Sequence, residues 1–208
     1  MLRVGLTGGI ACGKSTVAAM MQELGCHVLN ADQMAHRFIE PGQPAYDQVV
    51  REFGGEILDA QGRVARAKLA EIVFSDPARL ARLNAIIHPR VLAELDLELD
   101  RFSRADSNGV AVVEAALLIE SGYHHRLDRL IVVWCTPEQQ LARLSDPGSG
   151  RGLTPEQAQR RIAAQLSLAE KRKLADDQIN CSGALDETRR QVTALVERLK
   201  HLAAASKI

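Results

Sequence analysis

The pattern of hydrophobic positions changes its period soon after the N-terminus. Residues 2–7 form a short run with Val4 and Leu6 that is typical of a strand, and glycines follow it. From Lys14 onward the apolar residues recur at helical spacing, and Gly25 stands where that helix would end. The pattern therefore predicts a strand, a glycine-rich turn and a helix.

Further apolar runs indicate the other strands of a sheet. Residues 26–32 predict a second strand with Asp32 at its carboxyl end, and residues 109–120 and 127–135 are rich enough in valine to be buried on both faces. Residues 176–180 are a weaker candidate for a last strand. Because helical patterns alternate with these runs, we expect an α/β fold with a doubly wound parallel sheet.

Helical patterns replace strand patterns in the middle of the chain. We expect one domain with a core of residues 1–30 and 109–208 and an inserted helical lobe of residues 31–108. Within the lobe, Pro77 suits the first turn of a helix, and Pro89 is expected to begin another one. An inserted lobe of this kind is typical of enzymes that enclose a second substrate.

A second interruption of the core is expected to be a mobile lid, residues 141–170. Its first part is rich in Gly, Ser and Pro and holds Arg143 and Arg151. Thr154 and Gln157 then form a capping box, which predicts that a helix begins there.

Composition narrows the possible partners. The chain has 208 residues, with 26 Lys and Arg against 26 Asp and Glu, so no overall charge attracts nucleic acid or an anionic membrane. No stretch approaches the roughly 18 apolar residues of a membrane span. We therefore expect a cytoplasmic protein without nucleic-acid or membrane partners, and we also expect it to be a monomer. Four scattered cysteines are expected to be reduced and structural: Cys12, Cys26, Cys135 and Cys181.

The glycine-rich turn satisfies the phosphate-loop pattern. Gly8 is followed after four residues by Gly13, Lys14 and Ser15, between an expected strand and an expected helix. Such a loop binds the phosphates of ATP through backbone N–H groups, while the lysine reaches the β and γ phosphates and the serine hydroxyl coordinates Mg²⁺. The residues expected to hold ATP are Gly8, Gly9, Ala11, Cys12, Gly13, Lys14, Ser15 and Thr16, with Ser15 as metal ligand.

The loop alone does not name the reaction, because kinases, GTPases and motors share it. The chain has no guanine-reading motif of the GTPase type, and it is short for a motor. A small core with an inserted lobe and an arginine-bearing loop suits phosphoryl transfer to a small molecule. A nucleotide-dependent switch that binds a partner protein remains the alternative from another class.

Five motifs together resemble those of the dephospho-CoA kinase family, in that family's order. The resemblance covers the whole chain and implies an ATP-dependent transferase that phosphorylates the ribose 3′-hydroxyl of dephospho-CoA, the last step of coenzyme A biosynthesis. A nucleoside or nucleotide monophosphate kinase is the alternative enzyme. The motifs are GLTGGIACGKST (5–16), NADQMAH (30–36), NAIIHPRV (84–91), ALLIESG (116–122) and AAQLSLAEKRKLADDQI (163–179).

Three positions depart from the family pattern. Asn30 stands where the family usually has Asp, although Asp32 keeps the second acid of that motif. Ala116 replaces a usual Pro, and Cys181 replaces a usual Asn. The last change removes an amide that could otherwise contact adenine.

The resemblance implies roles for several residues. Asp32 is the catalytic base, although a cap for a helix beginning near Gln33 would suit the same position. From the residues alone, Glu114 follows the apolar run 110–113 and is a possible acid of the type that holds Mg²⁺ through water, with a surface or packing role as the alternative.

Two further groups of side chains are assigned to phosphate and to the acceptor. Arg151 is expected to neutralise charge on the transferred phosphate together with Lys14, and Arg143 is a weaker candidate for the same role. His88 and Arg90 lie in the lobe that the resemblance makes the acceptor-binding part, so they are expected to bind dephospho-CoA.

Overall fold

A computed structural model describes residues 1–149 and 152–205. The chain forms two compact units, one of Met1–Asn30 with Glu98–Ile208 and one of Ala31–Leu97. The second unit ends before residue 108, where the sequence placed the end of the lobe, because the last residues of a long helix cluster with the sheet.

The first unit contains the sheet, whose strands are β1 (Leu2–Gly8), β2 (His27–Asn30), β3 (Val110–Glu114), β4 (Arg129–Trp134) and β5 (Asp177–Asn180). Its helices are α1 (Lys14–Glu23), α6 (Pro137–Ser145), α7 (Pro155–Ala163), α8 (Leu168–Leu174) and α9 (Leu185–Ala205), with short 3₁₀ turns at Tyr123–Arg126 and Pro147–Ser149. The second unit contains α2 (Ala31–Phe38), α3 (Tyr46–Phe53), a 3₁₀ turn at Gly55–Ile57, α4 (Arg66–Ser75) and most of α5 (Pro77–Ala105).

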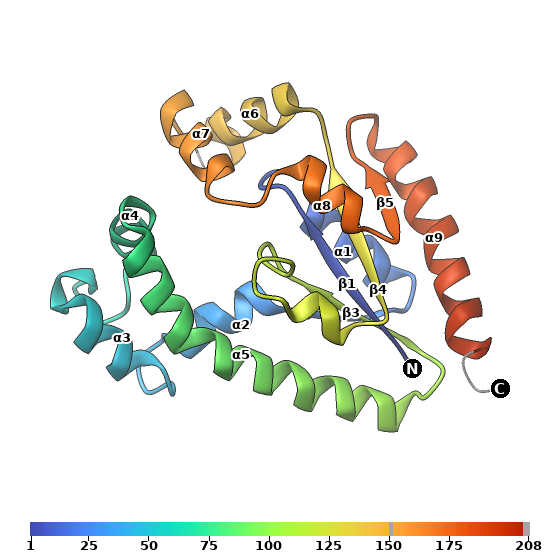
Figure 1. Ribbon diagram of the computed structural model, residues 1–208, viewed down its shortest axis with the longest axis horizontal. Helices are drawn as coiled ribbons and strands as arrows, with labels where there is room; N and C mark the ends of the chain where they lie inside the picture. The colour runs from blue at the N-terminus through green and yellow to red at the C-terminus, as the bar shows by residue number, and fades with distance from the viewer. Residues whose placement is uncertain (150–151, 206–208) are drawn as a thin grey trace. The chain divides into compact units, whose positions relative to one another are not determined.

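The sheet is parallel throughout, in the order β2-β3-β1-β4-β5 (Figure 1). β1 is central, with β3 on one side and β4 on the other. The expected α/β fold with a parallel sheet is therefore confirmed. In an open sheet of this kind the ligand site lies beyond the carboxyl ends of the strands, where the strand order reverses.

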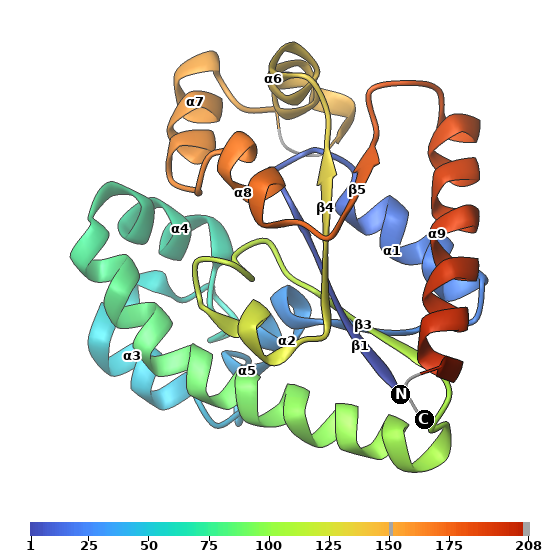
Figure 2. The same cartoon turned by 45° about the vertical axis from the view of Figure 1, so that its right-hand side comes forward.

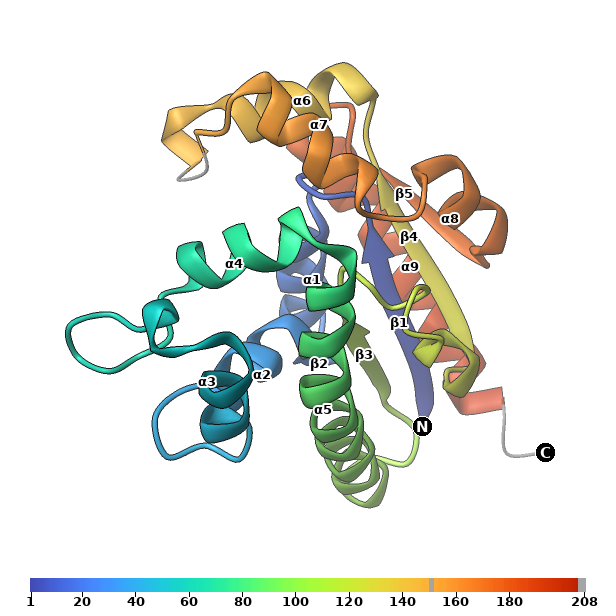
Figure 3. The same ribbon diagram turned by 60° about the vertical axis from the view of Figure 1, so that its left-hand side comes forward.

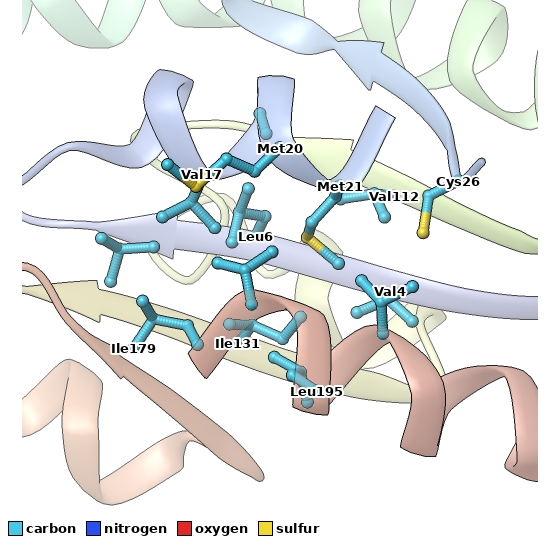
Figure 4. Packing of buried hydrophobic residues seen from close by; sticks show 14 of the residues in the cluster. Val4, Leu6, Val17, Met20, Met21, Cys26, Val112, Ile131, Ile179 and Leu195 are labelled. Atoms are coloured by element: carbon cyan, nitrogen blue, oxygen red, sulfur yellow. The ribbon is translucent and has the colours of Figure 1, made fainter. Parts of the chain in front are cut away.

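Helices α1 and α9 lie side by side along one face of the sheet (Figure 2). Alternate strand residues, among them Val4, Leu6 and Ile131, point to this face, because successive side chains of a strand point to opposite sides. Figure 4 shows them packed against Met21 of α1 and Leu195 of α9. This core fixes α1, and with it the loop that precedes α1.

The opposite face of the sheet carries α8 and the segment that follows β3. A Cβ on Gly5 of β1 would stand 2.5 Å from Leu118 Cδ2, so only glycine lets that segment approach the strand. Figure 3 shows the neighbouring helices α6 and α7 side by side, as the contacts between them require.

Several local expectations are confirmed. Helix α5 begins at Pro77, and Asp76 Oδ1 accepts a hydrogen bond from the N–H of Ala78 at 2.8 Å. The capping box at Thr154 is formed, with Thr154 and Gln157 each bonded to the backbone of the other. These elements follow from local rules that need no tertiary information.

Other expectations were wrong in their boundaries. β2 ends at Asn30, and Asp32 lies in the first turn of α2 instead of on the strand. β3 is shorter than the expected run 109–120 and ends at Glu114. Pro89 does not begin a helix, because α5 continues through it. The apolar residues after Glu114 pack as a turn, which periodicity alone does not separate from a strand.

The second unit has a small apolar core of its own. Its buried side chains include Phe38, Val49, Phe53, Ile57, Leu69 and Val73. Among the described residues of both units, each helix is either too short or too polar to cross a membrane.

Candidate active site

The phosphate loop joins β1 to α1, and two of its glycines have a steric reason. A Cβ on Gly8 would stand 2.3 Å from the carbonyl oxygen of Val133 on the neighbouring strand. Gly13 precedes α1 with φ at 98°, in the left-handed region that favours glycine. Between them, Ala11 has φ at 61°, although it carries a side chain. The loop is therefore a tight turn held partly against local preference.

Lys14 and Ser15, the first residues of α1, meet the carboxylate of Glu114 at the carboxyl end of β3. Glu114 Oε1 accepts hydrogen bonds from Lys14 Nζ at 2.8 Å and from Ser15 Oγ at 2.7 Å. Glu114 Oε2 accepts a third from Asn30 Nδ2 at 2.6 Å. The register β2-β3-β1 places all four residues together, because the carboxyl ends of parallel strands share one edge.

The buried carboxylate of Glu114 therefore accepts hydrogen bonds from three side chains at the mouth of the loop. Its side chain is 3% exposed, and a carboxylate so far removed from water requires charged or hydrogen-bonding partners. Lys14 supplies the opposite charge, and Asn30 supplies a neutral donor at the position where the family usually has the first aspartate of its motif. An aspartate at position 30 would place like charges side by side.

The donors at this site are those that Mg²⁺ prefers. The hydroxyl of Ser15 and the carboxylate of Glu114 are hard oxygen ligands, 2.7 Å apart through Ser15 Oγ and Glu114 Oε1. Mg²⁺ in phosphate-transfer sites is held by one or two such groups together with substrate phosphates and water. The residues present fit that ion.

Three side chains from the region of α6 and α7 hold the backbone of the loop. Gln140 Nε2 donates to the carbonyl of Ile10 at 2.8 Å, and Gln165 Oε1 accepts from the N–H of Ile10 at 3.0 Å. Arg143 donates to the carbonyl of Ala11 at 3.3 Å and to that of Cys181 at 2.9 Å. Arg143 thus binds backbone carbonyls of the phosphate loop and of the segment after β5.

A pair of buried thiols joins the loop to the residue that follows β4. The sulfur atoms of Cys12 and Cys135 are 3.3 Å apart. The hydrogen bond between the two thiols lowers the pKa of Cys135 to about 7, helped by the nearby charge of Arg143, while the same contact and burial raise the pKa of Cys12. Cys181 is also buried, and burial raises the pKa of its thiol. All four cysteines are free thiols.

An ion pair between the buried Lys171 and Glu120 anchors the segment that follows α7. Lys171 Nζ, on α8, lies 2.9 Å from Glu120 Oε1 and donates to the carbonyl of Ala116 at 2.9 Å. The N–H of Leu166 donates to the same Glu120 oxygen at 3.0 Å. The residue next to Gln165 is therefore fixed to the turn that follows β3.

In the second unit, Asp32 lies in the first turn of α2 and is half-buried. A carboxylate there interacts favourably with the helix dipole. Its charge raises the pKa of His36, one turn along, but burial and the charge of Arg66 outweigh it, so that pKa is lowered. Because α2 already begins at Ala31, Asp32 is not the cap of a helix that starts near Gln33.

His88 and Arg90 lie in the middle of α5. His88 is half-buried, and burial lowers the pKa of its imidazole. The guanidinium of Arg90 donates to the carbonyl of Ile86 on its own helix and to Gln48 Oε1 at 3.1 Å. Both contacts lie within the helical unit.

The structure thus brings Lys14, Ser15 and Glu114 together, and it leaves Arg151 outside the described residues. Nothing in the spacing of residues singles out Gln140. Gln165 belongs to a motif that carries the family resemblance, which was the one available signal for it. Distant hydrogen-bond partners such as these become visible only in the folded chain.

A parallel sheet with a phosphate loop after its central strand, and Lys14 and Ser15 at its mouth, defines a nucleotide-binding protein of the P-loop class. Residues 2–187 match the sequence model of the family described as "Dephospho-CoA kinase". The chain belongs to the dephospho-CoA kinase family.

Individual relatives agree with this placement. The chain is 45% identical over 197 residues to "Dephospho-CoA kinase" of Geobacillus kaustophilus, covering 95% of this chain and 96% of that relative. The solved structure "Crystal structure of TT1252 from Thermus thermophilus" has a TM-score of 0.78 at 34% identity and covers 95% of this chain and 97% of that one. "Dephospho-CoA kinase from Campylobacter jejuni." has a TM-score of 0.69 at 26% identity, with 96% and 97% covered.

Proposed function

We propose that the protein transfers the γ-phosphoryl group of ATP to the ribose 3′-hydroxyl of dephospho-CoA, giving coenzyme A and ADP. One observation carries the proposal: in a chain of this family, Lys14 and Ser15 already lie at the mouth of a formed phosphate loop, paired with a buried acid. This arrangement is suited to binding triphosphate without rebuilding the fold.

Lys14 would leave Glu114 for the β and γ phosphates when ATP binds. Its interaction strengthens as negative charge develops on the transferred group, so it lowers the barrier to transfer as well as assisting binding. The loop N–H groups hold the remaining phosphate oxygens, and the residues assigned to ATP are Gly8, Gly9, Ala11, Cys12, Gly13, Lys14, Ser15 and Thr16.

Ser15 would hold Mg²⁺ through its hydroxyl, and Glu114 would orient the water around that ion. When bound, Mg²⁺ would neutralise charge on the phosphates of ATP. Asn30 keeps one oxygen of Glu114 engaged while Lys14 and Ser15 turn toward the nucleotide.

We assign the base that accepts the hydroxyl proton to Asp32. In-line transfer requires a carboxylate beside the acceptor oxygen, and in the family motif Asp32 is the acid that this chain retains. His88 and Arg90 are assigned to dephospho-CoA, and Arg151 to the transferred phosphate. Transfer is direct, so no phosphorylated enzyme intermediate forms.

The cytoplasmic location, the monomeric state and the absence of nucleic-acid and membrane partners remain predictions. The alternative of a nucleoside or nucleotide monophosphate kinase is not favoured, because the family match extends over most of the chain.

The experiment is ADP release from Mg²⁺ and ATP with dephospho-CoA, AMP, adenosine or no acceptor. We expect rapid release with dephospho-CoA and slow release in the other three reactions. Comparable or faster release with AMP would replace the proposal by a nucleotide monophosphate kinase. Equal slow release in all four reactions would support a nucleotide-dependent switch instead.

A further inference from the structure

The peptide groups of Ile10 in the phosphate loop are held on both sides by glutamine side chains. Gln140 Nε2, on α6, donates to the carbonyl at 2.8 Å, and Gln165 Oε1, two residues after α7, accepts from the N–H at 3.0 Å. Gln140 is 6% exposed, so its contact is shielded from water. The two glutamines use opposite ends of the same functional group.

The residue after Ile10 is the strained one. Ala11 has φ at 61°, a left-handed conformation that is unfavourable for a residue with a Cβ. Such a conformation persists only where the surroundings determine it. The glutamines fix the peptide groups before Ala11, and Arg143 donates to the carbonyl of Ala11 itself at 3.3 Å.

The side chains that hold the loop are themselves anchored. Gln140 lies in the first turn of α6, which begins with a complete capping box at Thr136. Gln165 precedes Leu166, whose N–H donates to Glu120 Oε1 at 3.0 Å, and Glu120 is paired with the buried Lys171. The loop is therefore tied to fixed points, not to freely rotating surface groups.

We propose that Gln140 and Gln165 are positioning residues that hold the strained turn at Ile10 and Ala11 in the shape that binds the phosphates of ATP. They act through the backbone of the loop and need not touch the nucleotide. The inference rests on the proposed function only in that the loop binds ATP, and it is independent of the acceptor.

The test uses the fact that Gln140 donates its hydrogen bond, whereas Gln165 accepts its hydrogen bond. Gln165 uses an oxygen as acceptor, which glutamate retains, whereas Gln140 uses an N–H donor, which glutamate lacks. Methionine is similar in length and removes the hydrogen bond at either site. Glutamate should therefore be better than methionine at position 165 and worse than methionine at position 140.

The measurement is the dissociation constant of a non-hydrolysable ATP analogue with Mg²⁺, by calorimetry and without acceptor. Loss of a neutral hydrogen bond should weaken binding about three- to tenfold in Gln140→Met and in Gln165→Met. Gln165→Glu should recover most of that loss, and Gln140→Glu should bind more weakly than Gln140→Met. Gln22→Met and Gln22→Glu, on the exposed side of α1, are the matched controls and should bind as the wild type does.

A second measurement separates positioning from general stability. In the Ala11→Gly background the strain is removed, so Gln165→Met should weaken binding less than it does in the wild type. The KM for dephospho-CoA should stay unchanged in Gln165→Met. The proposal would be overturned if the glutamate and methionine variants had the same order of affinity for the ATP analogue at both sites. It would also be overturned if the methionine variants bound the analogue as the wild type does. The binding measurements use ATP without acceptor, so they do not depend on which acceptor the enzyme uses.

Discussion

At the carboxyl end of the sheet, the candidate functional side chains form hydrogen bonds with residues that are far away in the sequence. In the helical unit, they form hydrogen bonds with residues of that same unit. Lys14 reaches Glu114, and Gln165 reaches Ile10. Arg90, by contrast, donates to Ile86 one turn back on its helix and to Gln48 within the same unit. The comparison indicates that the nucleotide site is formed by the fold, while Arg90, which we assign to the acceptor, is occupied by local contacts.

This difference has an energetic basis. A buried carboxylate such as Glu114 cannot be left without partners, so the core fixes Lys14, Ser15 and Asn30 before any ligand binds. Half-buried groups such as His88 and Arg90 are under no such requirement. Their arrangement can therefore change at small cost when the acceptor binds.

The largest effect is expected from Asp32→Asn. The amide keeps the shape of the carboxylate but cannot accept a proton, so phosphoryl transfer should fall by about 10²- to 10⁴-fold. ATP affinity and melting temperature should hardly change. Turnover, ATP binding and thermal unfolding of the variant check this.

Asp32→Ala provides the control for a structural role. If Asp32 only stabilised the first turn of α2, the Asn variant would be nearly normal, and the Ala variant would lose about 1 kcal/mol of stability with a matching loss of function. Near-wild-type transfer by Asp32→Asn would require another base.

Lys14→Ala tests the nucleotide site at the carboxyl end of the sheet. It removes a charge contact that strengthens in the transition state, so the activation free energy of transfer should rise by on the order of 3 kcal/mol or more. Turnover should therefore fall by about a hundredfold or more. Circular dichroism should show that the fold persists. Lys68→Ala, which removes a lysine bonded to a backbone carbonyl of the helical unit, is the matched control and should leave turnover unchanged. A Lys14 variant with nearly normal turnover would contradict the phosphate-loop assignment.

A pair of arginine substitutions sharpens the contrast between the two units. Arg143→Ala removes contacts to the carbonyls of Ala11 and Cys181, so the KM for ATP should rise by about tenfold with the KM for dephospho-CoA unchanged. Arg90→Ala should have the reverse effect. Steady-state kinetics with each substrate varied in turn would show the crossed pattern, and parallel changes in both constants would break the comparison.

The smallest effect concerns pH and His88. Burial lowers the pKa of His88 below its ordinary value of 6.5, so the folded state holds the neutral imidazole while the unfolded state takes up a proton. Stability should therefore be lost as the pH falls through about 6.5 toward the lower pKa of the folded state. Thermal unfolding of His88→Gln and wild type from about pH 7 to about pH 5 should show a smaller loss in the variant; an equal loss would mean that His88 does not contribute.

Much of the fold was predictable because local rules determine it. The strand and helix around the phosphate loop, the start of α5 at Pro77 and the capping box at Thr154 all follow from residue spacing. The exact ends of β2 and β3 were not predictable, because an apolar run does not show where the chain leaves the sheet. The continuation of α5 through Pro89 overrode a local preference.

The site was predictable only where one motif contains it. Lys14 and Ser15 were identified from spacing, while the bond from Asn30 to Glu114 joins residues from two different strands. That bond also gives a physical reason for the departure at position 30, which the sequence showed without explaining. Gln140 could not be found, because nothing in its local sequence indicates a partner 130 residues away.

The central claim is transfer of the γ-phosphoryl group to one hydroxyl of dephospho-CoA, and the product tests it most directly. The wild-type protein would be incubated with ATP labelled at the γ-phosphate and dephospho-CoA, and the product would be examined by NMR and the protein by mass spectrometry. The account predicts that the label is found on the ribose 3′-oxygen, in coenzyme A, with none on the protein. Label on another hydroxyl, on the protein, or only in inorganic phosphate would contradict it.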